Sequence, residues 1–185
     1  MTRPDGIRIP HLPQRRPSAS GRRTHLFMAM HAVVEPDGSV AWQEDDWGVN
    51  ALHDAGEQSM LNVYLREQAN PTKFLALLND ATVAETDGTM SAVTEAKTPG
   101  SDGYSRQQIL STDWTDNGLV GGDYRFSAAE ETFGPISGTA MTVTHSAICT
   151  TSTGAGLLLA TLATSATTTV AVNQSFKVIF RWTQQ

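Results

Sequence analysis

Beyond residue 72 the chain alternates apolar and polar residues with a period of two, in short segments separated by Gly, Asp, Asn and Ser. In the clearest segment, every second residue from Phe176 to Trp182 is aromatic or aliphatic, and Lys177 and Arg181 lie between them. Such alternation is typical of strands with one buried face. The strand candidates are 73–78, 90–95, 104–110, 124–127, 140–149, 156–162, 167–172 and 174–182. Because no helical segment separates them, they predict a mainly β domain over 26–185, an antiparallel β-sandwich of the jelly-roll or immunoglobulin-like kind.

A hairpin is predicted upstream of this region. Two apolar segments, 26–34 and 39–42, flank the sequence Glu35-Pro36-Asp37-Gly38. Proline pre-sets the first turn angle and glycine accepts a positive φ, so this sequence favours a tight turn between two strands.

A single amphipathic helix is predicted over 49–67. Apolar residues recur there at spacings of three to five, Asn50 is available as an N-cap, and Pro71 follows the end. The opposite side is polar, so one stripe of the helix is expected to dock across an edge or end of the sandwich. Gly56 lies within the helix, where glycine is unfavourable, and this predicts close backbone packing at that point.

The first 25 residues differ sharply from the rest of the chain. They hold six of the 13 basic side chains and four of the eight prolines, against one acidic residue, Asp5. A segment of this composition cannot bury enough apolar surface to order itself, and its prolines favour extended conformations. We therefore predict an extended arm with a reach of about 70 Å that lies on a partner. The arginines expected to bind that partner are Arg3, Arg8, Arg15, Arg16, Arg22 and Arg23.

The remaining 160 residues hold 7 basic and 18 acidic side chains, a net charge of −11. This charge argues against nucleic acid as a partner of the body. Cys149 is the only cysteine, so an internal disulfide and two-cysteine zinc motifs are excluded. No apolar run approaches the ~18 residues of a membrane span, and we expect no membrane partner.

His145 and Cys149 are residue types that pair in cysteine enzymes. On one strand, however, residues four apart lie ~13 Å from each other, beyond hydrogen-bond reach. We expect His145 on the face of Met141, Val143 and Ala147, packed in the core or an interface, and Cys149 as a small buried residue.

Metal and cofactor sites are not favoured by the remaining motifs. The segment 113–118 lacks the spacing of a calcium loop, and Asn117-Gly118 favours a turn instead. Asp45 and Asp46, with Glu44 and Trp47, could bind a cation, but an acidic approach to the helix is the more common meaning of such a run. Phosphate-loop, dinucleotide-binding and hydrolase motifs are missing from the sequence. A hydrolase with two carboxylates stays an alternative, although the sequence selects no particular pair of carboxylates.

The tryptophans and threonines leave further alternatives. Trp42 and Trp182 are expected to anchor the core or an interface, whereas Trp114 lies in a turn-rich segment. An exposed tryptophan on a β-sandwich would favour a carbohydrate-binding module. Ser and Thr crowd 150–169, which predicts either contact with another subunit or a solvated sheet face.

The order of short motifs from the helix onward resembles small structural proteins of tailed bacteriophage virions. The resemblance covers about residues 49–185, and its motifs are 73–78, Val93-Thr94-Glu95, Gly103-Tyr104-Ser105-Arg106-Gln107, Trp114, Phe133-Gly134-Pro135, Ser137-Gly138, Val143-Thr144-His145 and 176–182. It implies a decoration, minor capsid, tail or fibre component, and it carries over no catalytic residue.

Together these features predict a non-enzymatic virion protein without cofactor or metal. The preferred hypothesis is a capsid decoration or minor capsid protein that binds the shell through its N-terminal arm and self-associates. A tail or tail-fibre component is the alternative, with other virion proteins as partners in either case, and a carbohydrate-binding module is the alternative from another class. Trp114, Tyr104 and Arg106 are the candidate interface residues of the body.

Overall fold

The computed structural model describes residues 25–44, 48–49, 51–120 and 123–184. The six arginines predicted to bind a partner lie outside these residues, as do Asp45, Asp46 and the predicted N-cap Asn50.

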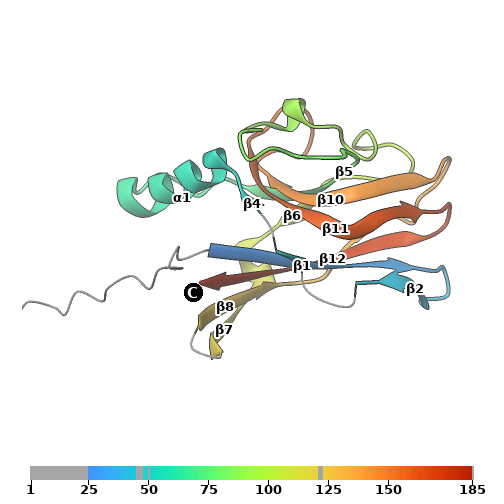
Figure 1. Ribbon diagram of the computed structural model, residues 1–185, viewed down its shortest axis with the longest axis horizontal. Coiled ribbons are helices and arrows are strands. Elements are labelled where there is room, and N and C mark those ends of the chain that lie inside the picture. Colours follow the sequence, from blue (N-terminus) through green and yellow to red (C-terminus); the bar gives the residue numbers. More distant parts are fainter. Residues whose placement is uncertain (1–24, 45–47, 50, 121–122, 185) are drawn as a thin grey trace, which may run out of the picture.

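Two antiparallel sheets pack face to face and form the β-sandwich that the alternation predicts (Figure 1). The first sheet has the order β2-β1-β12-β8-β7, with β3 beside β1 and β9 beside β12. Its strands are β1 (His25–Val34), β2 (Val40–Gln43), β3 (Gly48–Val49), β7 (Trp114–Val120), β8 (Asp123–Ala128), β9 (Glu131–Phe133) and β12 (Ser175–Gln184). The second sheet, in the order β4-β11-β10-β5-β6, contains β4 (Ala51–Leu52), β5 (Lys73–Leu78), β6 (Gln107–Ile109), β10 (Met141–Cys149) and β11 (Leu158–Val170).

The main core lies between the sheets. The alternation in β12 places Phe176, Val178 and Phe180 there, with at most 1% of each residue exposed. Their counterparts on the second sheet include Leu75 and Leu77 from β5. Burying side chains of this size stabilises the fold by about 1.5–3 kcal/mol each.

The predicted hairpin is confirmed. β1 and β2 pair antiparallel, and the N–H of Gly38 donates to the carbonyl of Glu35 at 2.9 Å. Gly38 has a φ of +86°, a conformation that the absence of a Cβ permits.

The helix α1 (Asp54–Arg66) begins five residues later than the pattern predicts. The residues before it serve as short edge strands, because β3 pairs with β1 of the first sheet and β4 with β11 of the second. His53 is the N-cap; Nδ1 of its ring donates to the Glu85 carbonyl at 3.0 Å, and Nε2 lies 3.0 Å from the Thr161 hydroxyl. Burial lowers the pKa of His53, which favours the neutral ring in this setting.

The predicted close packing at Gly56 is confirmed. A Cβ at this position would lie 2.2 Å from the carbonyl oxygen of Leu159 in β11. The first turn of α1 is therefore seated on the second sheet, and the helix projects past the end of the sandwich (Figure 1).

Four other expectations for the strands require correction. The segment 90–95 contains the 3-10 helix η1 (Met90–Ala92) in place of a strand. The two candidates 156–162 and 167–172 form one continuous strand, β11. The segment predicted as a turn at 113–118 is mostly β7, which follows the 3-10 helix η2 (Ser111–Asp113), and β9 has no counterpart among the candidates.

A second apolar cluster covers the outer face of the five-stranded sheet. It contains Ala76 and Leu78 from β5, Ala147 and Cys149 from β10, and Met90 from the long connection between β5 and β6. That connection runs over the sheet in Figure 1, so the sheet has both faces buried at this place.

Candidate functional site

An apolar groove opens at the end of the sandwich from which α1 projects, and it has a volume of about 670 Å³. Both sheets and the helix contribute to its walls. Its lining residues are Leu52, Gly56, Ser59, Met60, Leu61, Val63, Leu65, Asn70, Lys73, Trp114, Phe126, Ile148, Leu159, Ala160 and Trp182. A space of this size and character suits an apolar side chain or a short peptide.

The aromatic wall of the groove is the continuation of the inner face of the first sheet. Phe126 is directly opposite Trp182, and Trp114 is opposite Ala128, so these side chains share one face. Trp114, Ala128 and Trp182 also pack against the main core. The groove is therefore an extension of the core surface that the second sheet leaves open.

The helical wall is apolar and largely exposed. Met60 is 36% exposed, Leu61 57% and Leu65 69%. On β7 and β8, Leu119 and Tyr124 are also exposed, at 66% and 53%. An apolar surface of this extent marks an interaction site.

Lys73 is the basic residue in the lining. Its ammonium donates to the side-chain oxygen of Asn70 and to the carbonyl of Pro71, the latter at 3.4 Å. Burial lowers the pKa of Lys73. The lysine thus fixes the chain that follows α1, at the edge of the groove.

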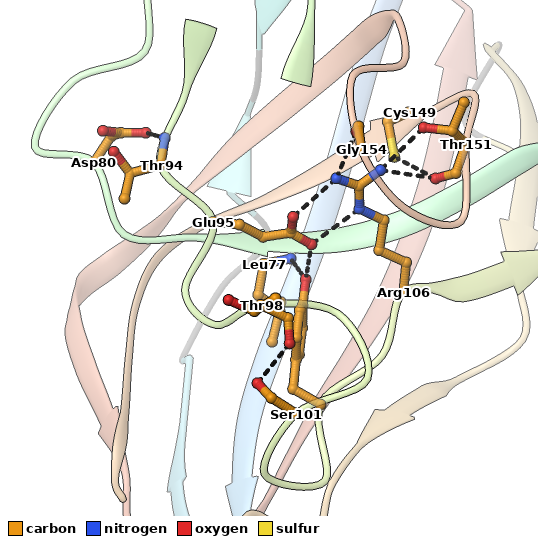
Figure 2. Close-up of polar contacts among 11 residues, drawn as sticks. Leu77, Asp80, Thr94, Glu95, Thr98, Ser101, Arg106, Cys149, Thr151 and Gly154 are labelled. Carbon is orange, nitrogen blue, oxygen red and sulfur yellow. Dashed lines mark hydrogen bonds and ion pairs between the residues drawn. The ribbon is translucent and has the colours of Figure 1, made fainter. Parts of the chain in front are cut away.

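Figure 2 shows a second polar arrangement, built around Arg106 and Glu95. Two guanidinium nitrogens of Arg106 donate to the two carboxylate oxygens of Glu95 at 2.9 and 2.8 Å. The same guanidinium donates to the carbonyls of Thr151 at 2.9 Å and Gly154 at 3.0 Å, and to the Thr151 hydroxyl at 3.0 Å. Burial alone would lower the pKa of Arg106, but Glu95 outweighs it, so the pKa is raised and the charge is retained.

Tyr104 completes this arrangement. Its hydroxyl donates to Glu95 at 2.6 Å and accepts the backbone N–H of Leu77 at 3.0 Å. Burial and the Glu95 carboxylate raise the pKa of the Tyr104 phenol. Together, Tyr104 and Arg106 fasten the 79–106 connection and the 150–157 loop to the five-stranded sheet.

The structure separates the three candidate interface residues of the body. Tyr104 is 1% exposed and Arg106 7%, and their polar groups bind within the chain, so neither is placed to meet a partner. Trp114 is partly exposed and lines the groove. Of these three residues, Trp114 alone therefore lies at the groove.

His145 and Cys149 do not form a reactive pair. The Cys149 thiol is buried, where its sulfur contacts the Thr151 carbonyl at 3.5 Å and burial raises its pKa. A bulge between Val143 and His145 shifts the register of β10. His145 therefore shares a face with Ala147 but not with Met141 and Val143, which corrects the expected face.

A Ser–His–Glu arrangement lies inside the sandwich. Nε2 of His31 is 2.7 Å from the Ser146 hydroxyl, and Nδ1 is 2.7 Å from Oε2 of Glu44. Hydrolases use such a hydrogen-bonded Ser–His–carboxylate arrangement for nucleophilic catalysis. Here His31 and Ser146 have no exposed surface, and no substrate reaches Ser146 in this structure.

The Glu44 carboxylate is tied to both sheets. It accepts the backbone N–H of His31 at 3.0 Å and that of Ser165 at 2.7 Å. Burial would raise the pKa of Glu44, but these hydrogen bonds and the His31 ring lower it overall. The arrangement is a buried polar bridge between the sheets, and Glu44 does not belong to an acidic helix approach.

Two further classes of site find no support among the described residues. In the described part of the chain, no group of three or more His, Cys, Asp or Glu side chains is placed to hold a metal ion. In the same residues, no helix is long and apolar enough to cross a membrane.

The groove and the buried bridge were not predicted from the sequence. A signal for the groove existed, because Leu61 and Leu65 interrupt the polar side of the predicted helix. The bridge had no local signal, since Ser146 is 115 residues from His31 in the chain.

Comparison with known proteins gives one family. A family described as podophage GP4 fiber I protein gp80 matches residues 51–181, which run from β4 through most of β12. Among curated proteins, no sequence matches the chain.

Proposed function

We infer the function of this protein from its family: the chain belongs to the podophage GP4 fiber I protein gp80 family, and it is a bacteriophage virion protein of the tail-fibre class. The family supports the tail-fibre alternative better than capsid decoration. The proposal is that this chain is a non-enzymatic structural part of the fibre, held to other virion proteins by its N-terminal arm.

The observation that carries this proposal is the family match, and the polar chemistry of the body agrees with it. Arg106 is paired with Glu95, and His31 and Ser146 are enclosed between the sheets. These groups stabilise the fold, whereas an enzyme would present such groups to a substrate. The exposed apolar groove is instead a surface suited to protein contacts.

The proposed attachment is electrostatic. Six arginines in the first 25 residues offer planar guanidinium groups that bind carboxylates in pairs of hydrogen bonds. Repeated copies of such a contact in a symmetric particle would strengthen a weak individual interaction. We also propose that copies of the chain associate with one another in the fibre.

The test is to locate the protein on the particle and then to remove the arm's charge. Gold-labelled antibodies against the body are expected to mark the tail of intact virions; labelling of the head would support capsid decoration instead. A variant with all six arm arginines changed to Gln should enter virions about tenfold less, or less still, because six exposed charge contacts at ~0.2–1 kcal/mol each total about 1–6 kcal/mol, and 1.4 kcal/mol corresponds to tenfold.

The matched control is Arg66→Gln, which removes one exposed charge from α1 and should enter virions normally. Equal incorporation of the six-arginine variant and the wild type would contradict attachment by the arm. The solution mass of the full chain tests self-association, and a monomer at all concentrations up to that of the assembling particle would contradict it.

A further inference from the structure

The groove beside α1 leaves apolar surface uncovered, with Leu61 57% and Leu65 69% exposed, and the chain itself contains a segment suited to cover it. We propose that residues 7–13, Ile-Arg-Ile-Pro-His-Leu-Pro, dock in this groove of the same chain. This goes beyond attachment to the virion, because it assigns a receptor site on the body to the apolar part of the arm.

The chemistry of the segment fits the lining. Ile7, Ile9 and Leu12 are its apolar side chains, and Pro10 and Pro13 favour an extended, polyproline-like backbone. Proline-containing segments of this kind dock in grooves lined by aromatic rings, since their backbone is already ordered and little entropy is lost on binding. Trp114, Phe126 and Trp182 supply such rings here.

The connection between the arm and the groove is short. β1 begins at His25, which pairs with Gln184, two residues after the groove residue Trp182. The 12 residues from 13 to 24 span up to about 37 Å when extended at ~3.1 Å per residue, compared with about 20 Å for the length of α1.

This tether favours the same chain over a second copy. A short covalent linker places the segment at a millimolar effective concentration beside the groove. A segment from another molecule would need a protein concentration of that order to compete.

Electrostatic attraction between the arm and the body also favours docking. The arm carries a net charge of +5 and the rest of the chain −11. The elements around the groove carry both signs, since Asp54, Glu57 and Asp116 are balanced by Arg66, Lys73, Arg125, Lys177 and Arg181, so the attraction comes from the acidic body as a whole. Arg8, between the two isoleucines, would be drawn to the acidic body while its neighbours enter the groove.

Docking in the same chain would hold the arm against the body before assembly. A virion partner with carboxylates would then compete for the arginines and release the arm.

The first test places a photo-activated cross-linking amino acid at Ile9, and in a second variant at Leu12, in the full-length protein. Cross-linked peptides identified by mass spectrometry should contain residues 59–65 of α1 or the strands that carry Phe126 and Trp182. The control position is Val172, which is exposed but remote from the lining residues, and it should give no cross-links to the groove.

Mixing nitrogen-15-labelled and unlabelled protein distinguishes the source of the segment. Cross-links that join only peptides of one isotopic composition, with no mixed pairs, confirm docking within the chain. Mixed pairs would show that a second copy fills the groove, and the absence of groove cross-links at both positions would leave it for another protein; either result overturns the proposal.

Hydrogen exchange provides a second readout that does not depend on the cross-linker. The triple variant Ile7→Ser/Ile9→Ser/Leu12→Ser should exchange amides in 60–66 about tenfold faster than the wild type, a loss of about 1.4 kcal/mol of docking free energy. Protection in β5 and β10 should not change, which verifies that the body stays folded. Equal exchange in 60–66 for the two proteins would refute docking.

Discussion

Arg106 shows how a residue that usually lies on the surface becomes part of a protein's interior. Its side chain is 2% exposed, and it makes hydrogen bonds to Glu95, Thr151 and Gly154. A buried charge is tolerated only when such partners replace the lost water. The motif Gly103–Gln107 was singled out from the sequence, yet its role is to join two loops of one chain.

Replacing Arg106 with Met tests this role. We expect a loss of about 3–5 kcal/mol of unfolding free energy, because Glu95 and the two loop carbonyls lose their buried partner. Urea unfolding measures the change. The control Arg66→Met removes an exposed arginine and should alter stability by no more than about 0.5 kcal/mol. Similar values for the two variants would show that the ion pair contributes little.

Tyr104 allows a finer test at the same place. Tyr104→Phe keeps the ring, which stacks on Phe133 with centroids 5.7 Å apart, but removes the hydroxyl. The buried N–H of Leu77 then has no acceptor in its place, and we expect a loss of about 1–3 kcal/mol in urea unfolding. The matched variant Tyr124→Phe changes an exposed hydroxyl and should be neutral. A neutral Tyr104→Phe would indicate that Leu77 finds another acceptor.

At the scale of elements, α1 illustrates the limit of periodicity. The apolar spacing over 49–67 is real, but Val49 and Leu52 belong to strands that complete the edges of the two sheets. Periodicity depends on residues that are close in sequence, whereas the positions of Val49 and Leu52 depend on pairing with strands β1 and β11. The bulge in β10 has the same character, since it exchanges the faces of the strand without a sequence signal that alternation detects.

The seating of the helix is testable through Gly56. Alanine favours helices by about 1 kcal/mol over glycine, so an isolated helix would gain stability. In the protein, a Cβ would approach the Leu159 carbonyl to 2.2 Å, and we expect Gly56→Ala to lower the unfolding free energy by about 1–3 kcal/mol through overpacking.

The control for this variant is Gly88→Ala, where the nearest atom to a new Cβ is 3.8 Å away. Thermal or urea unfolding should find it close to the wild type. An increase in stability for Gly56→Ala would mean that α1 can move away from β11 without loss.

At the scale of the whole molecule, the two sheets are joined by the His31–Glu44–Ser146 bridge as well as by the apolar core. Glu44 links the end of β2 to His31 of the first sheet and Ser165 of the second. The folded protein lowers the pKa of Glu44 below its ordinary value of 4.5, so folding favours the carboxylate. Its contribution is fully present above pH 4.5 and is lost as the pH falls through the lower, folded value.

Glu44→Gln should therefore reduce stability at pH 7 and flatten the loss of stability below pH 4.5. Urea unfolding between pH 3 and pH 7 measures both effects. Glu57→Gln, an exposed change of the same charge on α1, should keep the wild-type dependence on pH. An unchanged acid slope in Glu44→Gln would show that other carboxylates cause it.

Features that depend on neighbouring residues could be predicted from the amino-acid sequence. Alternation predicted the β-sandwich and the buried face of β12, turn chemistry predicted the hairpin at Gly38, and glycine within a helical segment predicted the contact at Gly56. The motif order also indicated a tailed-phage virion protein, which the family match supports.

The contacts between residues far apart in the chain became visible in the folded protein alone. It enclosed Arg106 and Tyr104 in one chain, brought Ser146 to His31, and left the groove open between α1 and the aromatic face of the first sheet. The physical reason is that local patterns follow from backbone geometry and side-chain burial, whereas ion pairs, buried hydrogen bonds and grooves depend on which surfaces meet when the sheets pack.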